Sequence, residues 1–354
     1  MSTTNTTYVY IGSYADKDDQ GIYVYTLDRT TGKLKPISST SGIGNPSFLI
    51  VTPNQKYLYA VSESTEGPGA VAAFAIDPQN KDLTLLNQQS TEGTAPCHLT
   101  FDGTRTHLVV VNYSGGNICL YPLDEDGRIK KMTYNVQHQG HSINPDRQEA
   151  AHPHSANLAP DGKYIFVPDL GQDKIISYKI DLEAEKLVLQ GETTVKAGSG
   201  PRHFVFHPER NYAYVINELS STITAFSYEP EIQTLNEIQT VSALPEGYQG
   251  ESTAAEILIH PSGKFLYGSN RGHDSIAVFA LDSSTGLLTP LQHVSTQGKT
   301  PRNFTLTPDG KFLLVANQDG NNLVTFALDQ QTGKLSETGE VIDIEHPVCI
   351  KVLN

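Results

Sequence analysis

The chain repeats a hairpin in which apolar and polar residues alternate, and residues 198–223 (GSGPRHFVFHPERNYAYVINELSSTI) show this hairpin most fully. Two β-strands are predicted here, Arg202–His207 and Tyr212–Asn217, because both segments are rich in aromatic and β-branched residues. The run 208–211 between them contains Pro and Asn, which favour a turn over a continuing strand. The segment therefore predicts an antiparallel pair joined by a tight turn.

The expected register of this hairpin brings charged residues together at its open end. If His207 pairs with Tyr212, then Arg202 lies opposite Asn217, which directly precedes Glu218 in the chain. The opposite charges of Arg202 and Glu218 should therefore meet at the end that lies away from the turn. We expect the chemistry of the protein at that end.

The same template recurs along the chain as a first strand, a turn similar to Pro-Asp-Gly-Lys, a second strand that ends in Asn or Ser, and two further strands. The copies begin 47 to 57 residues apart, at Pro46, Pro96, Pro153, Pro201, Ala254 and Pro301. Residues 8–14 match only the second strand of the template, and the missing first strand begins at Pro347 near the C-terminus. Six full copies and one copy split between the termini make seven.

This repeat predicts an all-β protein, namely a seven-bladed β-propeller with four strands in each blade. Pairing of the C-terminal strand within the N-terminal blade would close the ring and remove a free sheet edge. A solenoid also repeats, but it has no reason to split one unit between its ends. We expect residues 1–354 to form a single domain in which residues 1–7 are a short flexible N-terminus.

Composition narrows the class of partner. The formal net charge of −14 argues against a nucleic-acid partner, but an anionic metabolite remains compatible if positive groups gather in one pocket. The N-terminus lacks the features of a signal peptide, and no stretch approaches the roughly 20 apolar residues that span a bilayer. The three cysteines are expected to be buried free thiols of a reducing compartment. The sequence thus predicts a cytoplasmic protein without a membrane partner, and it leaves the oligomeric state open.

Two positions of the template carry residues that the fold does not require. The position after the opening residue holds Ser47, Cys97, His154, Arg202, Ala255, Arg302 and Val348, and the position after the second strand holds Tyr14, Glu63, Tyr113, Leu170, Glu218, Arg271 and Gln318. By the hairpin argument, both positions lie at the same end of every blade, around the mouth of the central channel. We therefore expect a functional site at this mouth, formed by the charged or titratable residues His154, Arg202, Arg302, Glu218, Glu63 and Arg271.

An inserted loop and a pair of histidines in it could indicate a metal-binding site. The longest interval precedes Pro153, and its extra residues fall in the polar, His-rich loop 137–155 on the way into the fourth blade. His152 and His154, with His138 and His141 nearby, are of the type that binds zinc or iron. Two arginines at the same mouth make a cation site electrostatically poor, so we expect neither a metal nor another cofactor.

Nucleophilic catalysis is the weaker alternative, because no Gly-x-Ser-x-Gly motif occurs and His98 beside Cys97 should point to the opposite face of its strand. Acid–base chemistry with cationic stabilisation remains, and either His154 or Glu218 would be the general base. We favour His154, because its unperturbed pKa is better matched to neutral pH, whereas Glu218 beside Arg202 should stay ionised.

Several segments of the chain resemble the propeller-type lactonase family, in particular HPHSANLAPDGKYIFVPDLGQDKI, GPRHFVFHP, NELSSTI, SNRGHDSI and TPRNFTLTPDGKFLLVANQ. The similarity runs from about Tyr8 to Val352, and it departs at Ala151, where a Pro is common in the family. The family includes seven-bladed bacterial 6-phosphogluconolactonases and is related to the fungal carboxy-cis,cis-muconate lactonizing enzyme. The resemblance implies that the catalytic residues are His154, Arg202, Glu218 and Arg271. We further expect the substrate to contact His152, His203, Glu256, Arg302 and Asn317.

The resemblance implies hydrolysis of a sugar lactone, with 6-phosphoglucono-δ-lactone and its product 6-phosphogluconate as the leading pair. Arg202 and Arg271 would then stabilise the oxyanion or hold the phosphate. Two alternatives stay open: a non-catalytic propeller that binds a partner at the same face, and a cycloisomerase that forms a lactone from a dicarboxylate.

Overall fold

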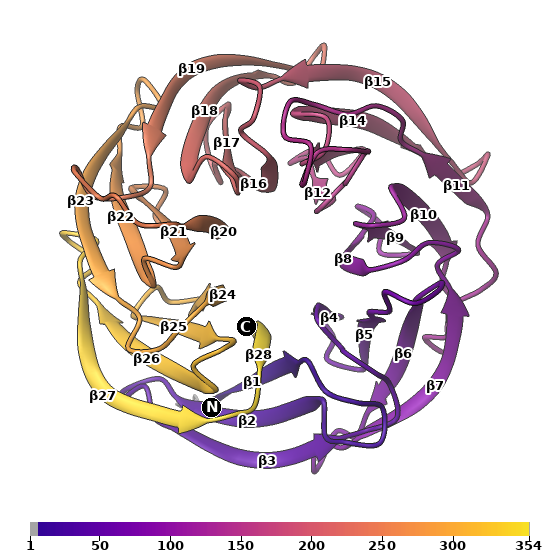
Figure 1. The fold of residues 1–354 in the computed structure, drawn as a ribbon. Helices are drawn as coiled ribbons and strands as arrows, with labels where there is room; N and C mark the ends of the chain where they lie inside the picture. The colour runs from indigo at the N-terminus through magenta and orange to yellow at the C-terminus, as the bar shows by residue number, and fades with distance from the viewer. Residues whose placement is uncertain (1–5, 354) are drawn as a thin grey trace.

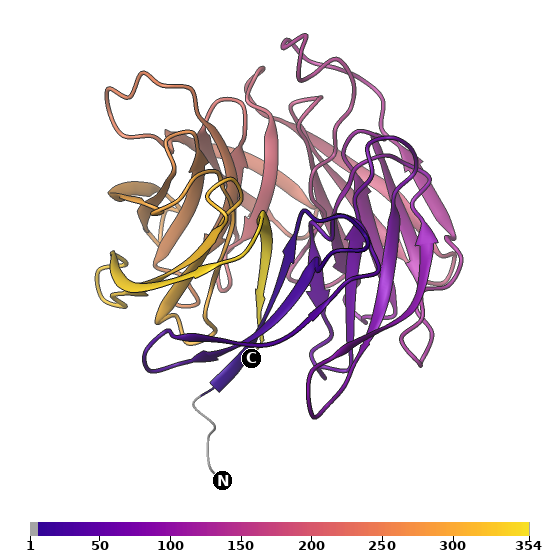
Figure 2. The same cartoon turned by 60° about the horizontal axis from the view of Figure 1, so that its bottom comes forward.

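The computed structural model describes residues 6–353, which form 28 β-strands and contain no helix. The strands form seven four-stranded sheets, which are arranged as the blades of a ring (Figure 1). Figure 2 shows the ring tilted, with long loops on one of its faces. The predicted seven-bladed β-propeller is confirmed. Among the described residues, therefore, no helix is available that could cross a membrane.

The blades are numbered here from the N-terminus, and the strands of each are given from the inner to the outer edge (Figure 1). Blade 1 contains β28 (Pro347–Val352), β1 (Thr6–Ser13), β2 (Ile22–Asp28) and β3 (Leu34–Thr40). Blade 2 contains β4 (Leu49–Val51), β5 (Tyr57–Ser62), β6 (Ala70–Ile76) and β7 (Leu83–Ser90). Blade 3 contains β8 (Pro96–Phe101), β9 (His107–Asn112), β10 (Asn117–Pro122) and β11 (Tyr134–Gln137).

The other four blades follow the same order. Blade 4 contains β12 (Asn157–Leu158), β13 (Tyr164–Asp169), β14 (Lys174–Asp181) and β15 (Lys186–Thr194). Blade 5 contains β16 (Pro201–Phe206), β17 (Tyr212–Asn217), β18 (Thr222–Glu229) and β19 (Thr234–Ser242). Blade 6 contains β20 (Thr253–Ile259), β21 (Phe265–Arg271), β22 (Ser275–Leu281) and β23 (Leu288–Ser295). Blade 7 contains β24 (Pro301–Leu306), β25 (Phe312–Asn317), β26 (Asn322–Leu328) and β27 (Leu335–Asp343).

Blade 1 joins the two ends of the chain. Strand β28 pairs antiparallel with β1, from Val352 opposite Val9 to Pro347 opposite Ser13. This pairing confirms the predicted ring closure and covers the inner edge of β1. Thr6 and Thr7, which were predicted to belong to a flexible N-terminus of residues 1–7, are instead the first residues of β1. Residues 1–5 of that prediction lie outside the described part of the chain.

A β-bulge changes the register of the hairpin in blade 5. Pro201 is opposite Asn217 and His203 is opposite Ile216, so Arg202 is an extra residue in β16. The prediction that Arg202 lies opposite Asn217 is therefore wrong by one residue. A bulge releases its extra residue from the regular ladder and redirects its side chain. The same irregularity occurs at the equivalent residues of three other blades, Cys97, Arg302 and Val348.

Tyrosines connect neighbouring blades in this chain, which has no Trp. Three buried tyrosines each donate their hydroxyl at 2.9 Å to a glycine carbonyl in a turn of the next blade, in the pairs Tyr59–Gly127, Tyr214–Gly286 and Tyr267–Gly333. Gly127 has φ +83°, and a Cβ on it would come within 2.4 Å of Tyr57, so only glycine fits this turn. The three cysteines are free and buried, as predicted.

Candidate active site

A polar pocket opens at the N-terminal ends of the inner strands, where the sequence predicted a functional site. Its volume is about 370 Å³. All seven blades contribute to its lining, through Tyr14, Glu63, Cys97, His154, Glu218, Arg271 and Arg302. Residues from both template positions singled out in the sequence thus meet in one concavity, because the bulged residues of the first strands and the residues after the second strands lie at the same end of each blade. Arg202 is not one of the lining residues: it is 2% exposed and pairs with Glu218.

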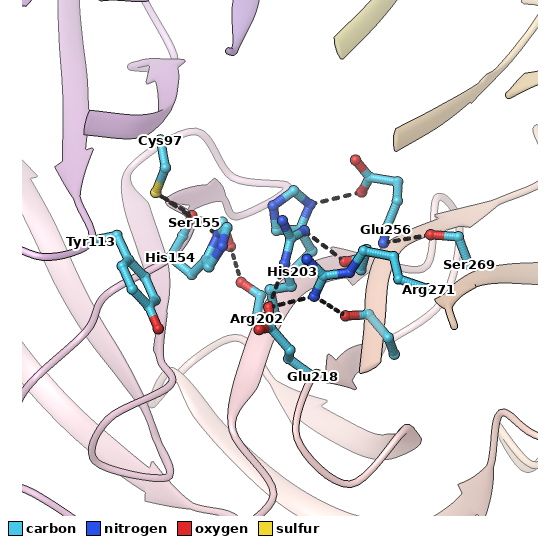
Figure 3. Close-up of polar contacts among 12 residues, drawn as sticks. Cys97, Tyr113, His154, Ser155, Arg202, His203, Glu218, Glu256, Ser269 and Arg271 are labelled. Carbon is cyan, nitrogen blue, oxygen red and sulfur yellow. Dashed lines mark hydrogen bonds and ion pairs between the residues drawn. The ribbon is translucent and has the colours of Figure 1, made fainter. Parts of the chain in front are cut away.

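Glu218 is the centre of a charge cluster in this pocket. Its Oε2 accepts from Arg202 Nε and Arg271 Nη2, each at 2.9 Å (Figure 3). Its Oε1 accepts from Arg147 Nη2 at 2.5 Å. The Glu218 backbone is fixed on both sides, because its N–H donates to Gly200 O at 2.7 Å and its carbonyl accepts from Ala254 N at 3.1 Å. Three guanidinium groups therefore share one carboxylate that is only 4% exposed.

This arrangement settles the charge of Glu218. Burial raises the pKa of a carboxyl group, but the guanidinium groups of Arg271, Arg202 and Arg147 outweigh burial and hold the pKa of Glu218 far below its usual range. Burial, together with the positive charges of Arg271 and Arg302, lowers the pKa of Arg202 to about 10 against the opposing effect of Glu218. Glu218 therefore stays ionised at neutral pH and is a poor proton acceptor.

His154 is the second functional group of the pocket, and it faces the pocket from blade 4. Its backbone N–H donates to Pro168 O at 2.9 Å, which ties the segment before β12 to β13. Its Nδ1 lies 3.8 Å from the Cys97 thiol, which also donates to the His154 carbonyl at 3.3 Å. Within residues 6–353, His154 Nε2 has no hydrogen-bond partner. This nitrogen is consequently available to a water molecule or a substrate.

Burial and positive charge keep His154 neutral. Burial lowers its pKa well below the usual value of 6.5, and the nearby Arg202, His203 and Arg302 add to the lowering. Burial also raises the pKa of the neighbouring Cys97 thiol to about 12, so this cysteine is a neutral thiol rather than a nucleophilic thiolate. A neutral imidazole with a vacant lone pair has the protonation state that a general base needs.

His203 and Glu256, which we expected to contact substrate, form a layer behind the pocket lining (Figure 3). His203 Nδ1 lies 2.8 Å from Glu256 Oε1, and its ring packs edge-to-face on His154 with 5.3 Å between the ring centroids. Asn303 donates to the other Glu256 oxygen. The structure thus places this pair against the His154 ring rather than among the residues that line the pocket.

His152 and Asn317 also lie outside the pocket lining. His152 stacks on Tyr113 at 4.7 Å between ring centroids, and its Nε2 lies 3.1 Å from a Glu149 oxygen. Asn317 donates to Thr296 O at 3.0 Å, a structural bond between the loop that precedes β24 and the end of β25. Among residues 6–353 no group of three or more His, Cys, Asp or Glu side chains is arranged to hold a metal ion.

Two features of the pocket were not predicted from the sequence. Arg147 reaches Glu218 from loop 137–155, and it also donates to Tyr113 Oη at 3.3 Å. The unusual length of that loop indicated a functional segment in the sequence, but it did not point to Arg147. On the other side of the pocket, Tyr14 donates its hydroxyl to Glu63 at 3.2 Å, and the Arg302 guanidinium lies 5.5 Å from the centre of the Tyr14 ring.

The mouth carries an excess of positive charge in a chain whose formal net charge is −14. Four guanidinium groups (Arg147, Arg202, Arg271 and Arg302) surround two carboxylates (Glu63 and Glu218), which leaves two formal positive charges unbalanced. Such a pocket favours an anionic ligand.

Comparisons with known proteins agree with this geometry. Residues 8–352 match the family described as "Lactonase, 7-bladed beta-propeller". The chain is 37% identical over 345 residues to the 6-phosphogluconolactonase of Bacillus subtilis, with 98% of each chain covered. It is 40% identical over 306 residues to the 6-phosphogluconolactonase of Formosa agariphila, covering 84% of this chain and 86% of the relative.

Solved structures give the same result. The structure of a periplasmic gluconolactonase of Pseudomonas aeruginosa, PpgL, superposes with a TM-score of 0.93 and 31% identity, covering 99% of both chains. A crystal structure of a protein from Bacteroides fragilis superposes with a TM-score of 0.93 and 36% identity, covering 100% of this chain and 99% of the other. The predicted resemblance is confirmed, and the chain belongs to the lactonase family of seven-bladed β-propellers.

Proposed function

We propose that this protein hydrolyses sugar lactones, and that its substrate is 6-phosphoglucono-δ-lactone, which it converts to 6-phosphogluconate. The observation that carries the proposal is the neutral His154, which lines a pocket with a guanidinium cluster and whose Nε2 has no bonded partner among residues 6–353. Ester hydrolysis needs a group that removes a proton from water and a positive group that stabilises the oxyanion. Two relatives that carry the name 6-phosphogluconolactonase support the choice of substrate.

The reaction follows from these positions. His154 Nε2 takes a proton from water, and the water oxygen attacks the lactone carbonyl. The carbonyl oxygen becomes an oxyanion, which Arg202 and Arg271 stabilise. When the carbonyl re-forms, the bond to the ring oxygen breaks, and His154 returns its proton to that oxygen. The ring opens to a hydroxy acid, which ionises at neutral pH.

In this mechanism Glu218 positions the arginines rather than acting as the base. Its carboxylate binds Arg202 and Arg271 through the same oxygen, so it fixes both guanidinium groups relative to each other. The depressed pKa of Glu218, in which the three guanidinium groups overcome the effect of burial, opposes proton transfer to it at neutral pH. This supports the assignment of His154 as the general base.

A panel of lactones tests the proposal. Purified protein is supplied with 6-phosphoglucono-δ-lactone, glucono-δ-lactone and a γ-lactone, and acid release is followed in a pH-stat against the spontaneous rate. We expect the phosphorylated δ-lactone to give the highest kcat/KM and exhaustive chelation to leave this rate unchanged. Absence of turnover on the whole panel would contradict the proposal and favour a binding protein. Activity that disappears on chelation and returns with one cation would require a metal in the mechanism.

We propose that the protein is located in the cytoplasm, where free thiols such as those of Cys97, Cys119 and Cys349 remain reduced. One structural relative is named a periplasmic enzyme, so fractionation of the producing cells is the direct test. Recovery of the protein with periplasmic markers would overturn this assignment.

A further inference from the structure

Arg302 differs from the other arginines of the pocket in its partners. Arg147, Arg202 and Arg271 each form an ion pair with Glu218. Within the described residues 6–353, Arg302 has neither an ion pair nor a hydrogen bond from its guanidinium group, although it lines the pocket and is mostly shielded from solvent. The carboxylates of Glu63 and Glu218 are close enough to stabilise its charge, but neither is bonded to it. A guanidinium offers five N–H donors, and those of Arg302 remain unused within residues 6–353.

The Tyr14 ring holds this guanidinium group in place while leaving its donors free. The Arg302 Cζ lies 5.5 Å from the centre of the Tyr14 ring, within the range of a cation–π contact. The Tyr14 hydroxyl is itself anchored on Glu63 at 3.2 Å. Such a contact attracts the guanidinium group but uses none of its N–H groups, so these donors stay available to an arriving anion.

Arg302 and His154 line the same pocket but come from different parts of the ring. Arg302 belongs to β24 of blade 7, and His154 directly precedes β12 of blade 4, on the opposite side of the seven-bladed ring (Figure 1). Glu218 and its partners Arg202 and Arg271 belong to blades 5 and 6, which come between these two blades around the ring. A substrate whose carbonyl lies at His154 would therefore extend its far end toward Arg302.

We propose that Arg302, supported by Tyr14, is the subsite for the phosphate monoester of the substrate, a proposal that rests on the lactonase function proposed above. A phosphate monoester carries close to two negative charges at neutral pH, which matches the two unbalanced positive charges of the mouth. A forked guanidinium group binds two phosphate oxygens at once. Arg271 is less suited to this role than we expected from the sequence, because it is committed to Glu218 and to Ala254 O at 3.1 Å.

The test measures selectivity rather than activity alone. Wild type, Arg302→Gln and Arg302→Lys are assayed on 6-phosphoglucono-δ-lactone and on glucono-δ-lactone. We expect the ratio of kcat/KM for the phosphorylated lactone to that for the plain lactone to fall about tenfold to a hundredfold in Arg302→Gln, mainly through KM. The selectivity ratio of Arg302→Lys should lie between those of wild type and Arg302→Gln, because lysine keeps the positive charge but cannot bind two phosphate oxygens as a forked guanidinium group does.

A matched control separates this effect from the loss of any arginine. Arg210 is also without an ion pair among residues 6–353, but it is exposed in the turn between β16 and β17, at the end of the hairpin away from the pocket. Arg210→Gln should leave both substrates unaffected. An unchanged selectivity ratio in Arg302→Gln would overturn the subsite, as would a larger change of the ratio in Arg271→Gln.

Binding of the product distinguishes failure of the subsite from failure of the proposed reaction. Calorimetry compares 6-phosphogluconate with gluconate on wild type and on Arg302→Gln, without any turnover. We expect wild type to prefer the phosphorylated acid and Arg302→Gln to lose most of that preference. Equal binding of the two acids by wild type would overturn the subsite even if lactones are hydrolysed. A clear preference that depends on Arg302 would support the subsite even if no lactone is turned over.

Discussion

The two ends of the inner strands form very different concavities. At their N-terminal ends lies the pocket of His154, Glu218 and the arginines, with a volume of about 370 Å³. At their C-terminal ends lies a wider hollow of about 590 Å³, whose lining combines apolar residues such as Ile50, Leu158 and Phe206 with polar ones and has Lys351 as its charged member. The strands β4, β8, β12, β16 and β28 contribute to this hollow, whereas all seven blades contribute to the pocket, so the blade repeat alone does not create the active site.

A layer of aromatic rings lies between the two concavities. Phe48 packs on His98 at 4.1 Å between ring centroids, His98 lies 5.5 Å from His203, and His203 lies 5.3 Å from His154. Lys351 approaches the Phe48 ring from the far side, at 4.1 Å. The difference between the ends shows that charged side chains gather where bulges and loops release them from the ladder, whereas the regular strand ends carry a single charged residue, Lys351, in the lining of their hollow.

Removal of β28 should have the largest effect, because this strand contributes to both ends of the channel. Deletion of residues 347–354 would leave the inner edge of β1 unpaired and exposed. We expect aggregation or loss of the cooperative melting transition, measured by light scattering and circular dichroism. A truncated protein that melts like wild type would contradict the importance of the closure.

Removal of the base should be the largest effect confined to the pocket. His154→Gln retains polarity but cannot accept a proton, so kcat should fall about 100-fold to 10,000-fold on both plain and phosphorylated lactones. The melting temperature serves as the control and should change little. If kcat is nearly normal in His154→Gln but lost in Glu218→Gln, the assignment of the base is wrong.

Glu218→Gln should lower the stability of the folded protein more than the loss of another carboxylate in the pocket does. It leaves the guanidinium groups of the shielded Arg202 and Arg271 and of the partly exposed Arg147 without their carboxylate, so we expect the free energy of unfolding to fall by about 3 kcal/mol. Glu63→Gln is the matched control, because within residues 6–353 the Glu63 carboxylate bonds only the Tyr14 hydroxyl, so this substitution should cost less than about 1 kcal/mol. Urea denaturation measures both, and equal losses would contradict the central role of Glu218.

The difference in unfolding free energy between wild type and Glu218→Gln should change with pH in a defined direction. Despite the opposing effect of burial, the guanidinium groups depress the folded-state pKa of Glu218, so its stabilisation is present above the unfolded pKa and is lost as the pH falls through the folded one. The gap in unfolding free energy between wild type and Glu218→Gln should therefore narrow below about pH 4.3. A gap that widens on acidification would exclude this origin.

The fall of kcat/KM at acidic pH should report the protonation of His154. Because burial first, and positive neighbours second, lower its pKa well below 6.5, kcat/KM for glucono-δ-lactone should fall only below that pH. The plain lactone is used because a phosphate ester titrates in the same range. A midpoint above pH 7 would show that another group is the base.

The smallest effect is expected at the far end of the channel. Lys351→Gln should change kcat/KM by less than about twofold, because the aromatic layer separates Lys351 from the pocket. Steady-state kinetics on both lactones measure this. A loss of tenfold or more would show that the two ends are coupled through Phe48 and His98.

The sequence by itself determined the architecture and much of the membership of the site. Seven copies of one hairpin, one of them split between the termini, predicted the blades and the closure by β28, because strand periodicity and turn residues are local properties of the chain. The same alignment of copies pointed to His154, Arg202, Glu218, Arg271 and Arg302, all of which lie at the predicted mouth.

Only the tertiary structure decided which side chains are partners. The bulge at Arg202 shifts the register by one residue, and a single extra residue leaves no clear mark in an alternating pattern. Arg147 meets Glu218 across 71 residues of sequence, which no local pattern encodes. His203 and Glu256 lie behind His154, and Asn317 bonds the backbone, because burial and side-chain direction depend on neighbouring blades. For the same reason, the lack of a carboxylate partner for Arg302 within residues 6–353 becomes visible only when all seven blades are in place.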